Sequence, residues 1–171
     1  LMEKLHNHSG RPSVMVLRPA DAEETTAAWK MAMENIYTPT ALILSRQDVT
    51  SVPNTSAEGV KKGAYIVSQD ENPQVVMLAS GSEVSTLMAG AELLRAEGIR
   101  LQIVSVPSEA IFRQQSKEYQ AEVLPQGVTR FGLTAGLPCN LEGLVGEHGT
   151  VWGLNSFGFS APYKVLDEKL G

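Results

Sequence analysis

The sequence has little cysteine: its 171 residues include Cys139 and no second one, so no internal disulfide can form. A chain of this length can fold around an apolar core without such crosslinks. The shortage of cysteine is typical of a reducing compartment, and we therefore expect a cytoplasmic protein. No apolar run approaches the roughly 20 residues of a membrane span, and no signal peptide is visible, so we expect no membrane partner.

Positive charge and cofactor fingerprints are scarce as well. The chain carries 14 lysines and arginines against 19 acidic residues, and its basic residues form no stripe, so we expect no nucleic-acid partner. There is no G-x-G-x-x-G motif and no P-loop lysine, which leaves no dinucleotide site. No carboxylate pair, nucleophile elbow or metal-ligand cluster stands out. The sequence therefore holds no complete active site, and we assign no catalytic residue and no metal ligand.

The first 47 residues contain a strand–helix–strand pattern. Apolar runs at 13–18 and 40–45 predict buried strands. Between them, Asp21 is a suitable N-cap for a helix of about 15 residues. The apolar positions of that helix predict its buried face, which consists of Ala22, Ala28, Trp29, Ala32, Met33 and Ile36. Two strands joined by a helix of this length form a partial parallel βαβ unit.

Residues 48–63 differ in composition from the segments on either side. They contain a proline, two glycines and many small polar residues with little periodicity. We interpret them as an interdomain linker or a long surface loop. The chain is thereby divided into residues 1–47, a linker at 48–63 and a second domain at 64–171.

The second domain alternates strands with helices. We expect strands at 64–68, 74–79, 99–106, 128–135 and 150–154, and helices at 83–97, 108–115, 116–124, 140–146 and 161–169. Such alternation predicts a three-layer α/β/α fold with a mostly parallel five-stranded sheet. Because a tight turn joins the first two strands, the first strand is a candidate for an antiparallel edge. We also expect the two tryptophans, Trp29 and Trp152, to pack in the core, and Cys139 to be buried or half-buried.

Ser80, Gly81 and Ser82 follow a buried strand and precede a helix. One interpretation is a plain helix cap, in which Ser80 and Glu83 form a capping box. The other is an anion site, because N–H groups at a helix start attract phosphate and ligands bind beyond the carboxyl ends of parallel strands. The sequence leaves both interpretations open, although the carboxylate of Glu83 would repel an anion unless it turns back to the cap.

Arg46 stands at the carboxyl end of the expected strand at 40–45. Its guanidinium has the planar set of donors that fits two phosphate oxygens. An arginine at a strand end is also well suited to a surface or interdomain salt bridge. From the residues alone, both roles remain open.

Six short segments occur in an order and at a spacing that together resemble the C-terminal part of transketolases. They are 17–21 (LRPAD), 39–42 (PTAL), 44–47 (LSRQ), 79–84 (ASGSEV), 104–108 (VSVPS) and 157–162 (FGFSAP). The resemblance implies that residues 1–47 are the tail of the family's pyrimidine-binding domain. It implies equally that residues 64–171 are its complete C-terminal domain.

Transketolases use thiamine diphosphate and a divalent cation, usually Mg²⁺, to move a two-carbon ketol unit between sugar phosphates. The resemblance implies that the cofactor-binding residues lie upstream, in the remainder of a transketolase chain that forms a homodimer. This chain would then be inactive alone and bind no cofactor. The resemblance also implies that Arg46 is a substrate-phosphate ligand in the intact enzyme.

Two alternatives remain at this stage. The self-contained second domain and the turn at 80–83 are compatible with a freestanding anion-binding or regulatory module. Many transketolases carry a glutamate and a tryptophan in the segment that matches residues 131–145, which here reads FGLTAGLPCNLEGLV, so the resemblance is looser there. The same region of a related thiamine diphosphate enzyme, such as deoxyxylulose phosphate synthase or a pyruvate dehydrogenase β subunit, is therefore the second alternative.

Overall fold

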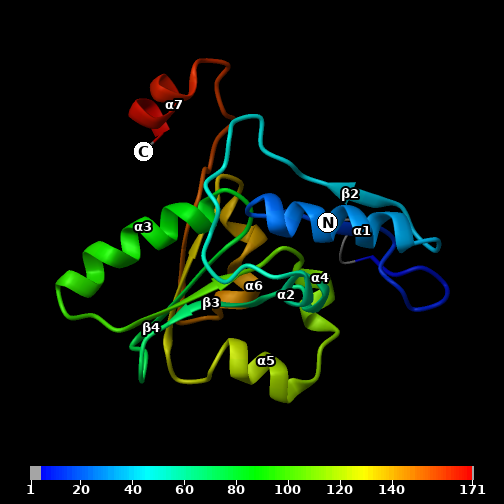
Figure 1. The fold of residues 1–171 in the computed structure, drawn as a ribbon, viewed down its shortest axis with the longest axis horizontal. Coiled ribbons are helices and arrows are strands. Elements are labelled where there is room, and N and C mark those ends of the chain that lie inside the picture. Colours follow the sequence, from blue (N-terminus) through cyan, green and yellow to red (C-terminus); the bar gives the residue numbers. More distant parts are fainter. Residues whose placement is uncertain (1–4, 171) are drawn as a thin grey trace.

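The computed structural model describes residues 5–170 and consists of a small strand–helix–strand unit beside a larger sheet domain (Figure 1). In the small unit, β1 (Met15–Leu17) and β2 (Thr40–Leu42) pair in parallel, and α1 (Ala22–Glu34) connects them. The expected parallel βαβ unit is confirmed. No helix among the described residues is both long enough and apolar enough to cross a membrane.

The strands of this unit are shorter than the sequence predicts. β2 ends at Leu42, and the N–H of Ile43 adds a last bond of 2.9 Å to the carbonyl of Leu17. β1 and β2 form a two-stranded sheet, so within residues 5–170 no third strand continues the ladder. The apolar residues that follow, Ile43 and Leu44, are exposed rather than buried.

The predicted buried face of α1 is wrong in most positions. Trp29, Met33 and Ile36 are 53%, 80% and 81% exposed. The residues that α1 buries are Glu24, Ala27 and Ala28, of which Ala28 alone was expected. The reason is that α1 packs against α2 (Ala57–Lys62) and the larger domain through small side chains, which permit a close approach.

The helix α2 lies inside the segment that was expected to be an irregular linker. Ser56 is its N-cap and accepts a bond of 3.1 Å from the N–H of Gly59. Gly63 ends it in the left-handed conformation, with φ of 83°. Val52 and Val60 are buried in the core. Residues 48–63 are therefore packed against the domain, and the two cap signals were missed in the sequence.

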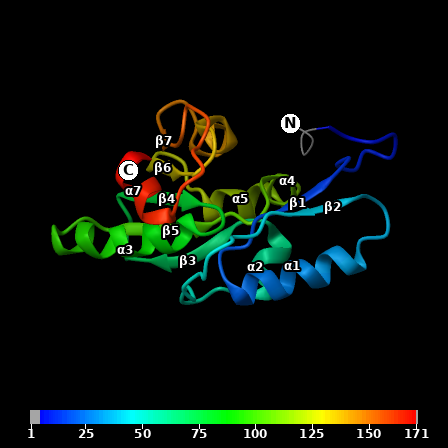
Figure 2. The same ribbon diagram turned by 90° about the horizontal axis from the view of Figure 1, so that it is seen from above.

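The larger domain is a five-stranded sheet with strand order β3-β5-β4-β6-β7 (Figure 2). β3 pairs antiparallel with β5 at one edge, and the other pairings are parallel, as expected. The strands are β3 (Tyr65–Gln69), β4 (Val75–Ala79), β5 (Leu101–Ser105), β6 (Thr129–Leu133) and β7 (Thr150–Trp152). The helices are α3 (Glu83–Ala96), α4 (Glu109–Arg113), α5 (Lys117–Val123), α6 (Glu142–Val145) and α7 (Tyr163–Leu170), with a 3₁₀ turn, η2 (Pro138–Asn140), before α6.

Side-chain alternation along the central strand β4 divides the core in two. Met77 and Ala79 face a cluster that includes residues of α1, α2 and α3. Val76 and Leu78 face a second cluster, built with residues of α4, α5 and α6. Helices thus cover both faces of the sheet, and the predicted three-layer α/β/α fold is confirmed.

Two further expectations about burial are wrong. Trp152 ends the edge strand β7 and is 42% exposed, because within the described residues no strand lies beyond it. Cys139 is in η2 and is exposed as a free thiol.

Candidate functional site

The carboxyl ends of β4 and β5 lie side by side, and the turns that follow them form one edge of the sheet. Ser80, Gly81 and Ser82 make the turn after β4, with Gly81 at φ of +66°. Open α/β sheets bind ligands at this edge. The turn at 80–82 is therefore a candidate ligand site.

Arg18, which directly follows β1, lies against this turn. Its Nη1 donates 3.0 Å to the carbonyl of Ser80 and forms an ion pair of 2.5 Å with Glu83. The N–H of Gly81 in turn donates 3.1 Å to the carbonyl of Arg18. The N–H of Arg18 donates 2.9 Å to the carbonyl of Pro107, in the segment after β5. One residue of the βαβ unit thus contacts the segments that follow two neighbouring strands.

These contacts overturn the expected capping box of Ser80 and Glu83. The N-cap of α3 is Ser82, and the carboxylate of Glu83 is directed at Arg18 instead of back to the cap. Ser82 donates its hydroxyl to the same carboxylate at 2.8 Å. An anion site at Ser80, Gly81 and Ser82 stays a prediction. The N–H of Gly81 already has an acceptor there, and a carboxylate lies beside the turn.

A second contact between the two units centres on Glu24, in the first turn of α1. Its Oε1 accepts bonds of 2.7 Å from the hydroxyl of Tyr65 and 2.6 Å from that of Ser105. Its Oε2 accepts 2.7 Å from the N–H of Ala20. Burial raises the pKa of Glu24 above its ordinary value, and the bonds from Ser105, Tyr65 and Ala20 oppose that rise. Burial and the charge of Glu24 also raise the pKa of the Tyr65 hydroxyl.

Asp21 extends this network into the segment at 48–63. Besides capping α1, with Oδ1 accepting 3.0 Å from the N–H of Glu24, it accepts through Oδ2 from Val52 and Thr55. The sequence reasoning identified the cap but missed Glu24 as a buried contact. The signal was present, because an acidic residue three positions after an N-cap is the spacing of a capping box.

Arg46 lies four residues beyond the end of β2, on the exposed segment that leads towards α2. Figure 1 shows this segment, in cyan, running away from α1 before it turns back. Within the described residues, no hydrogen bond or ion pair joins Arg46 to the turn at 80–82. Whether it binds phosphate stays a prediction.

The described residues offer no obvious metal centre. Within 5–170, no group of three or more histidine, cysteine, aspartate or glutamate side chains could hold a metal ion. His6 and His8 thus have no partners for a metal site in this part of the chain.

Comparison with known proteins gives the family. A family model described as "Transketolase-like TK C-terminal domain" matches residues 63–171. The chain belongs to the transketolase family. It is 44% identical over 176 aligned residues to the transketolase of Geobacillus stearothermophilus, an alignment that covers 99% of this chain and 26% of that protein. The chain thus spans about a quarter of the length of this curated transketolase.

Solved transketolases share the fold. The transketolase of Leishmania mexicana superposes with a TM-score of 0.85 and 39% identity, over 92% of this chain and 23% of that one. A Pichia stipitis transketolase in complex with sedoheptulose-7-phosphate superposes with a TM-score of 0.84 and 34% identity, over 94% and 23%. A split-gene transketolase, described as an inactive β4 tetramer, is 26% identical with a TM-score of 0.71, over 98% of this chain and 55% of that one.

These matches decide between the readings that the sequence left open. They are to transketolases, which are transferases, and they run through both the βαβ unit and the sheet domain. The chain corresponds to the C-terminal part of such an enzyme. A freestanding module and a related thiamine diphosphate enzyme are not favoured.

Proposed function

We propose that this chain acts as the C-terminal part of a transketolase. With the rest of the enzyme it would transfer a two-carbon ketol unit between sugar phosphates. The observation that carries the proposal is the match to the Geobacillus stearothermophilus transketolase, which extends over 99% of the chain. Thiamine diphosphate and Mg²⁺ would be held by the remainder of the enzyme, and the chain alone would be inactive.

The role that the geometry supports for the chain itself is structural. Residues 1–47 would be the end of the pyrimidine-binding domain, residues 48–63 the connection and residues 64–171 the C-terminal domain. Arg18 and Glu24 hold these parts together through the contacts described above. They would fix the orientation of the C-terminal domain against the catalytic part of the enzyme.

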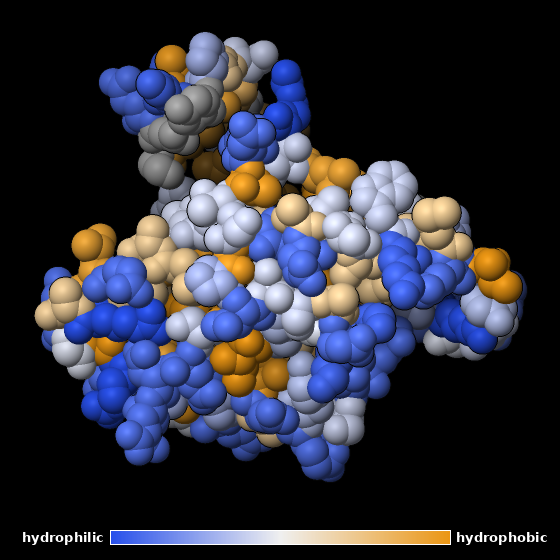
Figure 3. All heavy atoms as spheres, in the orientation of Figure 1, coloured by the Kyte–Doolittle hydropathy of each residue, from blue (hydrophilic) through white to orange (hydrophobic). Residues whose placement is uncertain are grey.

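The βαβ unit has an exposed apolar surface, which indicates that another part of the enzyme packs against it. Trp29, Met33, Ile36 and Tyr37 are all more than half exposed along and just after α1. Figure 3 shows hydrophobic atoms, in orange, at the right-hand end of the molecule, where the chain passes from α1 to β2. Large apolar side chains gathered on a surface are typical of an interface. We propose that the remainder of the transketolase, in a homodimer, covers them.

Arg46 is the residue that we propose for the substrate. Its guanidinium is exposed on a segment with little regular structure, which leaves it accessible to a ligand. Arginine suits a phosphate group because two parallel N–H donors match two oxygens. The sugar phosphate bound to the Pichia stipitis relative is a ligand of this chemical class. We further propose a cytoplasmic location, for which the free thiol of Cys139 is suited.

A chimera tests the function. The corresponding C-terminal quarter of the Geobacillus stearothermophilus transketolase is replaced by this chain, and ketol transfer is measured with thiamine diphosphate, Mg²⁺, a ketose phosphate and an aldose phosphate. We expect the chimera to be active, and both the truncated relative and the isolated chain to be inactive. A chimera that folds and binds the cofactor without activity would contradict the proposed role. Ketol transfer by the isolated chain would contradict its inactivity.

A further inference from the structure

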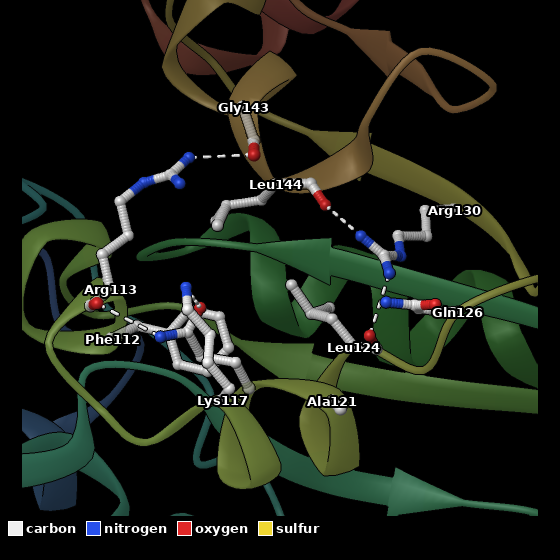
Figure 4. A pocket seen from close by; sticks show the side chains of 10 residues that line it. Phe112, Arg113, Lys117, Ala121, Leu124, Gln126, Arg130, Gly143 and Leu144 are labelled. Carbon is white, nitrogen blue, oxygen red and sulfur yellow. Dashed lines mark hydrogen bonds between the residues drawn. The ribbon is translucent and has the colours of Figure 1, made fainter.

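A cavity of about 290 Å³ lies on the face of the sheet that is covered by α4, α5 and α6 (Figure 4). Its lining includes three basic side chains, Arg113, Lys117 and Arg130, and the apolar Phe112 and Leu144. Arg130 belongs to the first half of β6, so the cavity is near the amino end of that strand. It is separate from Arg46 and from the turn at 80–82, neither of which lines it.

Arg130 brings a positive charge that forms no ion pair with a carboxylate within residues 5–170. Its Nη1 donates 2.8 Å to the carbonyl of Leu144, and its Nη2 donates to the carbonyls of Leu124 and Pro125 at 2.9 and 3.1 Å. All these acceptors are neutral. Burial lowers the pKa of Arg130, because the charged guanidinium loses contact with water.

The other partly buried arginines among the described residues each form an ion pair with a carboxylate. Arg18 forms an ion pair with Glu83 and Arg95 with Asp70. Arg130 shares their degree of burial but lacks such a partner among the described residues. Its bonds to carbonyls explain how it holds α6 in place. They do not explain why the charge is left unpaired.

Lys117 and Arg113 add to the positive character of the cavity. The ammonium of Lys117 has a distant contact of 3.5 Å with the amide oxygen of Gln120, which is also neutral. Arg113 is paired with Glu109 and donates 2.8 Å to the carbonyl of Gly143, beside the residue that Arg130 contacts. Two of the three basic groups therefore lack a negative partner within the described residues, in a chain whose net charge is −5.

We propose that this cavity binds a small phosphate-bearing anion. Three of the five N–H groups of Arg130 donate to the carbonyls above, which leaves two for phosphate oxygens. Lys117 adds an ammonium on another side of the cavity (Figure 4). The volume is at the small end of ligand sites, which suits inorganic phosphate, pyrophosphate or a small phosphate ester. The site would give the C-terminal domain a ligand of its own, apart from the substrate site proposed at Arg46.

Calorimetric titration of the 171-residue chain with phosphate and with pyrophosphate tests the proposal, at constant ionic strength. We expect saturable binding at one site, weakened about tenfold or more in Lys117→Gln and abolished in Arg130→Gln. Lys61→Gln, which changes an exposed lysine of α2 that does not line the cavity, should bind as the parent chain does. Circular dichroism shows whether Arg130→Gln has folded, and the exposed Lys117→Gln serves if it has not.

Three results would overturn the proposal. One is that neither anion binds saturably at concentrations up to about 10 mM. Another is an equal loss in Lys61→Gln, which indicates unspecific charge. The third is binding that disappears only in Arg46→Ala, which places the anion at the predicted substrate residue. None of these readouts depends on ketol transfer, so failure here leaves the proposed function standing.

Discussion

The carboxylate of Glu24 accepts a hydrogen bond of 2.7 Å from the hydroxyl of Tyr65, 41 residues further along the chain. Glu24 is in the first turn of α1, and Tyr65 begins the edge strand of the larger sheet. The bond therefore joins the two structural units, together with the bond that Ser105 donates to the same oxygen. A fully buried carboxylate is stable only with such donors, because burial without them is costly.

Glu24→Gln should lower the free energy of unfolding by about 1–3 kcal/mol at neutral pH. The amide oxygen of glutamine can accept from Tyr65 and Ser105, but its NH₂ group then faces the N–H of Ala20, which loses its acceptor. Denaturant unfolding measures the loss. Glu23→Gln, at the exposed neighbouring position, is the control and should change little.

The same pair of proteins tests the pKa of Glu24. Because burial raises this pKa above 4.5, the folded state binds the proton more tightly than the unfolded state does. The contribution of this tighter proton binding to the free energy of unfolding is fully present below pH 4.5 and is lost as pH rises through the folded pKa. The stability of the parent chain relative to Glu24→Gln should thus increase as pH falls from neutral towards 4.5. A difference that is constant over this range would contradict the raised pKa.

Asp70 should give the opposite pH dependence. Arg95 donates through Nε to both oxygens of Asp70, at 3.1 and 3.0 Å, and the N–H of Leu101 donates at 2.8 Å. These bonds, with Arg95 first, lower the pKa of Asp70 below 3.8. The stabilisation is present above pH 3.8 and is lost as pH falls through the lower folded pKa.

Unfolding of Asp70→Asn at several pH values checks this expectation. The variant should be less stable than the parent at neutral pH, and the difference should shrink below pH 3.8. Asp48→Asn, at an exposed position, is the control. A difference that persists unchanged under acid conditions would rule out the lowered pKa as its source.

Gly81→Ala should destabilise the contact between Arg18 and the turn. A Cβ at this position would lie 2.9 Å from Nε of Arg18, and the backbone is left-handed. Gly98→Ala is a matched control, since its φ of +82° is also left-handed but no atom lies within 4 Å of the added carbon. We expect both to lose about 1–2 kcal/mol from the backbone, and Gly81→Ala to lose more.

A double variant separates the two causes. In an Arg18→Ala background the added carbon at Gly81 has no guanidinium to displace. The excess cost of Gly81→Ala over Gly98→Ala should then disappear when the free energies of unfolding are compared. An excess that survives the removal of Arg18 would show that the crowding has another origin.

Arg46→Ala should raise KM for phosphorylated substrates in the chimeric transketolase. Loss of a charge-assisted hydrogen bond is worth about 1.5–3 kcal/mol, which corresponds to roughly tenfold to a hundredfold. KM for an unphosphorylated ketose should stay unchanged. The KM of Arg46→Lys for phosphorylated substrates should fall between that of the parent and that of Arg46→Ala. Equal effects on both substrates would remove the phosphate role.

Trp29 should report the assembly of the βαβ unit with the remainder of the enzyme. It is 53% exposed, and a Trp152→Phe variant leaves it as the single tryptophan. When the upstream part of a transketolase is added, its fluorescence should shift to shorter wavelength, since the indole loses contact with water. A complex that forms by size-exclusion chromatography without this shift would show that α1 is not at the interface.

Much of the fold followed from local patterns in the sequence. Asp21 was recognised as an N-cap, and it accepts the bond that a cap requires. The apolar run at 74–79 predicted a buried strand, and each face of β4 meets its own core. Such signals are readable because they depend on neighbours within a few residues.

Only the tertiary structure decided which face of α1 is buried and what Arg18 and Glu24 contact. Periodicity marked Trp29, Met33 and Ile36 as an apolar stripe, but it could not say that the sheet domain packs against the small residues instead. Arg18 meets Ser80 across 62 positions, and Glu24 meets Ser105 across 81. The sequence by itself determined the family resemblance and, apart from α2, the order of strands and helices. The contacts that join the two units were decided by the tertiary structure, because they depend on residues distant in the chain.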